Sequence, residues 1–125
     1  MMILKDDGMR IATHIECVRS AIDMMRGLMF RRSIPDDYAM VFVFSKPKRV
    51  SVHALFMRFP IDVIFLNGDK RIIDITRLDP WIGYRCVKDV SYMLETNSGT
   101  SDRHGLVVGT QLVFDAVATS IKDHA

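Results

Sequence analysis

Cysteine is scarce in this chain of 125 residues, which holds only two. Cys17 and Cys86 belong to no CxxC pair, so the sequence predicts neither a zinc site nor a dithiol redox motif. We expect both thiols to be free. Free thiols suit a reducing compartment, and we therefore expect a cytoplasmic protein.

A strong charge of one sign is also lacking. The 17 basic and 15 acidic residues leave a net charge of +2, too small for the field that drives non-specific binding to nucleic acid or membranes. The one basic cluster, SKPKRV at residues 45–50, is interpreted as a solvated turn between strands. The sequence begins with four apolar residues before two aspartates, far short of a signal-peptide core or a spanning helix. We expect neither a nucleic-acid partner nor a membrane partner.

Catalytic signatures are missing as well. The sequence contains no GxSxG nucleophile elbow, no glycine-rich phosphate loop before a helix and no HExxH motif. His14 and Glu16 share a face of a predicted strand, but they need a third ligand at a fixed spacing, which His53 or His104 would have to supply. We therefore expect no metal and no cofactor, and an enzyme remains only an alternative.

The chain does contain a series of short apolar runs. Hydrophobic residues make up 49% and charged residues 26%, which is typical of a folded protein, and we interpret residues 1–125 as a single domain. The runs AMVFVF, VSVHALFM and IDVIFL begin at Ala39, Val50 and Ile61. They are rich in β-branched and aromatic residues and are bounded by turn residues, which predicts central strands.

Two turn signals predict hairpins. Asn67 and Gly68 join IDVIFL to the more polar strand RIIDITRL, and this dipeptide is a strong hairpin signal. Asp7 and Gly8 lie between the apolar start of the chain and the run RIATHIECV at residues 10–18, which predicts a first hairpin.

The remaining segments add two strands and a helix. Strands are expected over residues 90–95 and 107–114, and Ser20 with Asp23 forms a capping pattern that places the principal helix over about residues 20–28. The predicted fold class is mainly β, with α+β at its margin. We expect a single-domain antiparallel β-sandwich, jelly-roll-like or a partly open barrel, with one short helix.

Five blocks, in their order and spacing, resemble the domain of unknown function family 192, also called uncharacterised protein family 0127. The blocks are RGLMFR, AMVFVF, FMRFPIDVIFL, YMLETNSG and GLVVGTQL, and they begin at Arg26, Ala39, Phe56, Tyr92 and Gly105. The resemblance covers about residues 10–115 and implies a compact, mainly β domain of jelly-roll-like sandwich type. Many members carry Phe-Trp-Met-Lys-Asn-Thr where this chain has LFMRFP at residues 55–60, which resembles the archaeal members.

Three ionisable residues stand in the apolar stretch HALFMRFPIDVIFL. They are His53, Arg58 and Asp62, and burying such groups is costly unless they are paired or hydrogen-bonded. Pro60 interrupts the pairing of the flanking strands, so a corner between strands is expected here. In a structural interpretation Arg58 neutralises Asp62 across this corner, with Arg26 as the alternative partner.

In a functional interpretation the ionisable groups line a cleft. The candidate ligand-binding residues are Arg26, His53, Arg58, Asp62, Glu95 and Asn97. Mixed charge at an apolar corner is a common construction of small-ligand sites. We expect a non-catalytic binding module for a small molecule or an extended peptide. The alternative is a small enzyme that uses Asp62 or Glu95 as general acid or base.

Two further expectations concern burial. Phe42, Val63, Phe65 and Leu94 should be almost fully buried in the core. Asp62 should accept hydrogen bonds or an ion pair from an arginine or from nearby backbone amides, because an unpaired carboxylate at an apolar strand would be costly.

Overall fold

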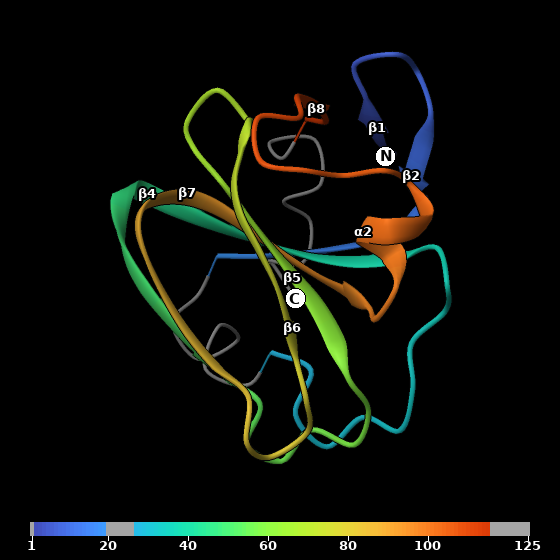
Figure 1. Cartoon of the computed structure of the whole chain (residues 1–125), viewed down its shortest axis with the longest axis vertical. Coiled ribbons are helices and arrows are strands. Elements are labelled where there is room, and N and C mark those ends of the chain that lie inside the picture. Colours follow the sequence, from blue (N-terminus) through green and yellow to red (C-terminus); the bar gives the residue numbers. More distant parts are fainter. Residues whose placement is uncertain (1, 20–26, 116–125) are drawn as a thin grey trace.

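The structure is a computed structural model, and it describes residues 2–19 and 27–115 (Figure 1). Its strands form a five-stranded sheet of order β3-β4-β7-β5-β6 and a three-stranded sheet of order β2-β1-β8, which are not closed into a barrel. The elements are β1 (Ile3–Lys5), β2 (Arg10–Ala12), β3 (His14–Val18), β4 (Tyr38–His53), β5 (Ile61–Leu66), β6 (Ile72–Leu78), β7 (Tyr84–Asn97), α2 (Thr100–Arg103) and β8 (Leu112–Val113). The predicted mainly β fold is confirmed.

The small sheet packs against one face of the large sheet. Ile3 of β1 and Leu112 of β8 share an apolar cluster with Ile64 of β5 and Leu94 of β7. All four are at most 1% exposed. Burial of facing side chains between two layers is what holds a β-sandwich together.

The opposite face of the large sheet carries a second apolar cluster. Phe42 of β4 and Val63 and Phe65 of β5 belong to it, together with Leu28 from the segment that leads toward β4. Phe42 is 2% exposed, Val63 and Phe65 are 0% exposed and Leu28 is 1% exposed. Since Leu94 of the first cluster is 0% exposed, the burial predicted for Phe42, Val63, Phe65 and Leu94 is confirmed. The two clusters follow from the alternation of side chains along β5 and β7.

Strands β4 and β7 are longer than predicted and pair as one curved antiparallel ribbon (Figure 1). The turn expected at residues 45–50 is wrong, because β4 runs through this segment as a strand. The ladder to β7 is interrupted between Val43 and Lys48, and β3 pairs only with residues 38–42 of β4. Pro47, which has no backbone N–H, therefore lies in a part of β4 where no regular ladder needs a donor.

The predicted hairpins are both present. Strands β1 and β2 pair antiparallel around Gly8, whose φ of 89° is easily adopted by glycine. Strands β5 and β6 pair antiparallel as expected, but the turn is built differently. The Asn67 Oδ1 accepts hydrogen bonds from the backbone N–H groups of Asp69 and Arg71, both at 3.0 Å, and the left-handed residue is Lys70 at φ 64°.

The run at residues 10–18 was expected to form one strand, and the structure divides it at Thr13. The backbone N–H groups of Thr13 and His14 both donate to the Asp37 carbonyl, at 2.9 and 3.0 Å. Beyond this point β3 pairs parallel to β4, in contrast to the antiparallel pairing expected throughout. A parallel pair needs a long crossover, and residues 19–37 are long enough to supply it.

Helical structure differs from the prediction. The helix expected over about residues 20–28 lies largely outside the described residues, and residues 27–30 form a turn. A short helix, α2, occurs instead between the strands expected over residues 90–95 and 107–114, and the last strand comprises only Leu112–Val113. Within residues 2–19 and 27–115, no helix has the length and apolar character needed to cross a membrane.

Candidate binding cavity

A cavity of about 370 Å³ lies on the face of the large sheet that carries the second cluster. Its walls come from residues 27–29, from the curved ribbon of β4 and β7, and from the corner before β5. Apolar side chains dominate the walls, among them Leu28, Met29, Phe42, Phe44, Met57 and Met93. A concave, mostly apolar site with few polar groups is the usual form of a small-molecule site.

Glu95 is the buried acid of this cavity. Its pairing with Met40 of β4 and Val63 of β5 places it on the second-cluster face, because side chains alternate along β7. It is 5% exposed, and its Oε1 has no hydrogen-bond partner among the described residues. Burial raises the pKa of Glu95 to about 7, although the Arg31 charge acts in the opposite direction.

Arg31 does not neutralise Glu95, because its guanidinium is bound to Glu16. Its Nη1 and Nη2 donate to the two carboxylate oxygens of Glu16, at 2.7 and 3.2 Å. The Tyr38 hydroxyl donates to the same carboxylate at 2.7 Å. The hydrogen bond that Arg31 donates to Glu16 raises the pKa of Arg31, so this guanidinium stays charged and bound to Glu16.

Cationic and polar residues line the same cavity from β4. Lys48, Arg49 and His53 are exposed, in contrast to Glu95. The His53 Nδ1 accepts a hydrogen bond from the Leu55 backbone N–H at 3.2 Å, which orients the imidazole. The structure therefore brings together two of the predicted site residues, His53 and Glu95.

Asp62 belongs to a different place. It pairs with Thr96, one residue beyond Glu95, and so lies on the other face of the sheet from the cavity. Its Oδ2 accepts hydrogen bonds from the backbone N–H groups of Gly99 and Ser101, at 3.2 and 3.0 Å, and the residue is 6% exposed. The expectation that backbone amides hold Asp62 is confirmed.

The expected pair of Arg58 and Asp62 is wrong. Arg58 is exposed, and in the described part of the chain no ion pair joins it to Asp62. The two backbone amides at the start of α2 satisfy the carboxylate in its place, because a carboxylate accepts such donors without needing a counter-ion. Arg26, the alternative partner, lies outside the described residues.

Asp62→Asn should destabilise the protein by about 1–2 kcal/mol in a urea titration. The amide oxygen would be a weaker acceptor for Gly99 and Ser101, and the new NH₂ group would need an acceptor at a buried position. Asp69→Asn, at an exposed turn position, is the matched control and should change stability by less than about 0.5 kcal/mol. Equal stability of the two variants would contradict a structural role for Asp62.

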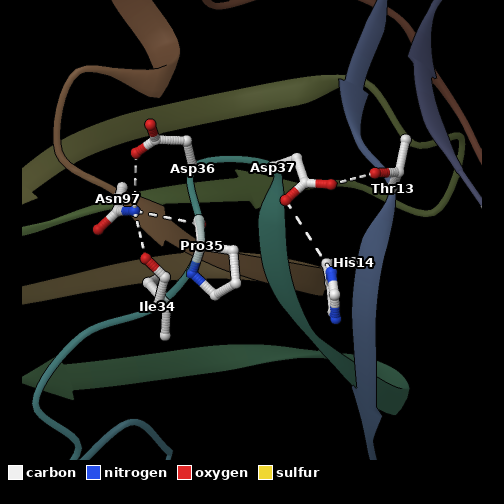
Figure 2. A network of polar contacts seen from close by, with 7 residues as sticks. All are labelled: Thr13, His14, Ile34, Pro35, Asp36, Asp37 and Asn97. Atoms are coloured by element: carbon white, nitrogen blue, oxygen red, sulfur yellow. Dashed lines mark hydrogen bonds and ion pairs between the residues drawn. The ribbon is translucent and has the colours of Figure 1, made fainter.

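Asn97 also has a structural role (Figure 2). Its Nδ2 donates to the carbonyl oxygens of Ile34 at 2.9 Å and Pro35 at 3.1 Å, so it ties β7 to the loop before β4. On the other side of this loop, Asp37 points toward Thr13 and His14. Asn97 does not line the cavity, and the site prediction that included it is not supported by its contacts.

Metal-binding side chains do not gather in the described residues. No group of three or more His, Cys, Asp or Glu that could hold a metal ion occurs there. Glu16 is bound by Arg31, and the His14 Nδ1 lies 4.0 Å from an Asp37 carboxylate oxygen. The His104 Nδ1 lies 2.9 Å from the Thr100 carbonyl, far in sequence from the other histidines.

An exposed aromatic cluster adjoins the cavity and was not predicted. Phe30, Phe56 and Trp81 are 63%, 43% and 55% exposed, and the Phe56 ring centroid lies 5.1 and 5.0 Å from those of Phe30 and Trp81. All three residues have left-handed backbones, with φ of 68°, 62° and 72°. Such strain, costly for bulky residues, concentrates at functional sites. Phe30 follows Met29 and Phe56 precedes Met57, both of which line the cavity.

Comparison with known proteins finds a matching protein family and similar proteins. The model of the family DUF192, described as uncharacterized ACR, matches residues 2–114. The chain is 36% identical over 110 residues to a UPF0127 protein of Pyrococcus furiosus, covering 86% of this chain and 92% of the relative. It is 31% identical over 104 residues to a UPF0127 protein of Pyrococcus horikoshii, covering 82% and 88%.

Two crystal structures share the fold. A Sinorhizobium meliloti protein named as a candidate transcription regulator is 26% identical, with a TM-score of 0.78 over 90% of this chain and 89% of that chain. A protein of unknown function from Novosphingobium aromaticivorans is 24% identical, with a TM-score of 0.79 over 90% and 82% of the two chains. The second likeness concerns the fold alone.

Proposed function

Since the chain belongs to the DUF192 family, whose description states no activity, its own cavity is the best guide to function, and we propose a non-catalytic binding module. The proposed occupant is a small molecule or one side chain of an extended peptide. The proposal rests chiefly on one observation, that the cavity contains a buried carboxyl oxygen of Glu95 with no partner among the described residues. Such an orphaned acceptor is costly, and a bound donor would remove the cost.

Size and composition support this proposal. The volume of about 370 Å³ falls within the range of roughly 300–1,000 Å³ that is usual for ligand pockets. Apolar walls with a few polar groups provide affinity through burial and specificity through hydrogen bonds. The aromatic cluster of Phe30, Phe56 and Trp81 adds an exposed apolar surface beside the cavity, which an extended peptide could cover.

An enzyme is the second candidate, and the acid in it would be Glu95. A carboxyl group with a pKa of about 7 suits general acid or base chemistry near neutral pH, and His53 lines the same cavity. Asp62 is not part of this alternative, because both its amide contacts and its position on the opposite sheet face separate it from the cavity.

The setting of the module is proposed as a cytoplasmic single domain. Cys17 is buried and Cys86 exposed, and neither forms a disulfide, which suits a reducing compartment. The Sinorhizobium relative is named as a candidate transcription regulator. A nucleic-acid role is not proposed here, because a net charge of +2 supplies little of the phosphate attraction that DNA binding requires.

A thermal-shift screen of small molecules tests the binding proposal. Compounds that fill the cavity should raise the melting temperature, and Val52→Phe should abolish the shift because it places a larger side chain in the cavity wall. Val113→Phe, at an exposed position of β8, is the matched control and should keep the shift. Hits that respond equally to both variants would bind elsewhere and contradict the proposal. If Val52→Phe does not fold, mapping of hits by amide NMR shifts on the unaltered chain decides the same point.

A further inference from the structure

The cavity has two unlike ends. Glu95, Lys48 and Arg49 all line it, but Glu95 is 5% exposed while Lys48 and Arg49 are exposed. Lys48 pairs with Val90, and Glu95 lies five residues further along β7, so the cation and the acid lie toward opposite ends of the ribbon. Arg49 is on the other face of β4, beside Cys86, where the Ser51 hydrogen bond and then Arg49 lower the pKa of the thiol. Lys48 is therefore the cation that faces the cavity. A ligand that fills the cavity would meet the Glu95 carboxyl group, ionised or protonated, at one end and positive charge at the other.

Complementary charge is missing at both ends. In residues 2–19 and 27–115 no ion pair includes Lys48 or Arg49, and the Lys48 Nζ lies 5.7 Å from the centroid of the Phe44 ring. Arg31, the cation whose charge reaches Glu95, is held by Glu16 at 2.7 Å. Glu95 therefore has no cation of its own among the described residues.

Apolar side chains separate the two ends. Phe44 of β4, Met57 of the corner and Met93 of β7 line the cavity together with the charged groups. Methionine is unbranched and polarisable and packs well against flexible alkyl chains. These walls suit methylene groups and offer little to a polar ligand body.

We propose that the cavity binds a small zwitterion of the ω-amino acid class, with its ammonium group on Glu95, its alkyl chain against the apolar walls and its carboxylate near Lys48. This inference rests on the proposed binding function and specifies the ligand. An ammonium group pairs with a buried carboxylate that otherwise lacks a counter-ion. The contact of the carboxylate with the solvated Lys48 is weaker and selects orientation.

An NMR titration of the full chain with four probes tests the inference. The probes are ε-aminocaproate, hexylamine, caproate and hexanol, which share an alkyl chain and differ in their charges. At neutral pH and low salt, ε-aminocaproate should bind most tightly and hexylamine next, with shifts at the cavity residues. Caproate and hexanol should both bind more weakly than the two amines, because neither carries an ammonium group for Glu95.

Variants separate the two ends. Glu95→Gln should lower the affinity for ε-aminocaproate and for hexylamine at least about tenfold. The affinity for hexanol should be nearly unchanged. Lys48→Gln should reduce the affinity for ε-aminocaproate to that for hexylamine. Lys88→Gln, an exposed lysine of β7 away from the lining, and Asp69→Asn are the matched controls and should change no affinity.

The outcomes distinguish the inference from the proposed function. If caproate or hexanol binds in the cavity as tightly as ε-aminocaproate, and Glu95→Gln changes nothing, the zwitterion is wrong while the binding module stands. If none of the four probes shifts a cavity residue, the zwitterion is overturned, and the thermal-shift screen decides the binding module separately. If Glu95→Gln does not fold, the order of the four probes on the unaltered chain and the Lys48→Gln variant decide the matter.

Discussion

Phe65→Ala should lower the free energy of unfolding by about 3–5 kcal/mol, the largest loss expected from a single change. Phe65 is 0% exposed in β5 and belongs to the second cluster with Phe42 and Met93. Its removal takes away buried apolar area and leaves a cavity in a layer fixed by backbone pairing on both sides of β5. A guanidinium titration with an unchanged slope measures the loss.

The control for this change is Ile82→Ala. Ile82 is 82% exposed, so its truncation should alter stability by less than about 0.5 kcal/mol. A loss below about 1 kcal/mol for Phe65→Ala would mean that the side chain lies at the surface. The assignment of faces along β5 would then be wrong, because a shift of one residue exchanges the two faces.

Glu95→Gln should make the protein more stable at pH 8 and leave it nearly unchanged at pH 4. The unaltered carboxyl has a pKa of about 7 in the folded state, raised by burial from its ordinary value of 4.5. Between these values the folded state binds more protons than the unfolded state, so stability falls as the pH rises. The total loss is on the order of 3 kcal/mol and is complete above about pH 7.

The measurement is a series of urea titrations from pH 4 to pH 8. The Gln variant should lack the part of the pH dependence that Glu95 contributes, because its amide does not ionise in this range. Asp69→Asn should retain the full dependence of the unaltered chain. Parallel stability curves for Glu95→Gln and the unaltered chain would show that Glu95 ionises in the fold as easily as in the unfolded chain.

Much of the fold could be predicted from local sequence. Short runs of β-branched and aromatic residues indicated strands correctly, and the turn residues Asn67 and Gly8 marked hairpins that the structure contains. The length of β4 was missed, because Pro47 and its basic neighbours are typical of a turn. Whether proline ends a strand depends on which backbone groups have partners there, and that is a property of the whole sheet.

The site was only partly predictable for a similar reason. Glu95 and His53 were named from their positions in apolar runs, and they do line one cavity. The pairing of Arg58 with Asp62 was wrong, because the donors to Asp62 are backbone amides at the start of α2, which carry no sequence signature. Arg31 was not named as a site residue, and its contact with Glu16 joins segments that only the fold brings together.

The small sheet has a consequence for how the chain is made. Strand β1 pairs with β8, so that Leu4 lies beside Val113 and Lys5 beside Leu112. During synthesis on a ribosome, the ladder between β1 and β8 can form only after residues 112 and 113 have emerged. Until then Ile3, which is 0% exposed in the finished fold, lacks the Leu112 side of its cluster. The sandwich is therefore incomplete until residue 113 has been made, and until then the chain exposes apolar surface that is prone to aggregate.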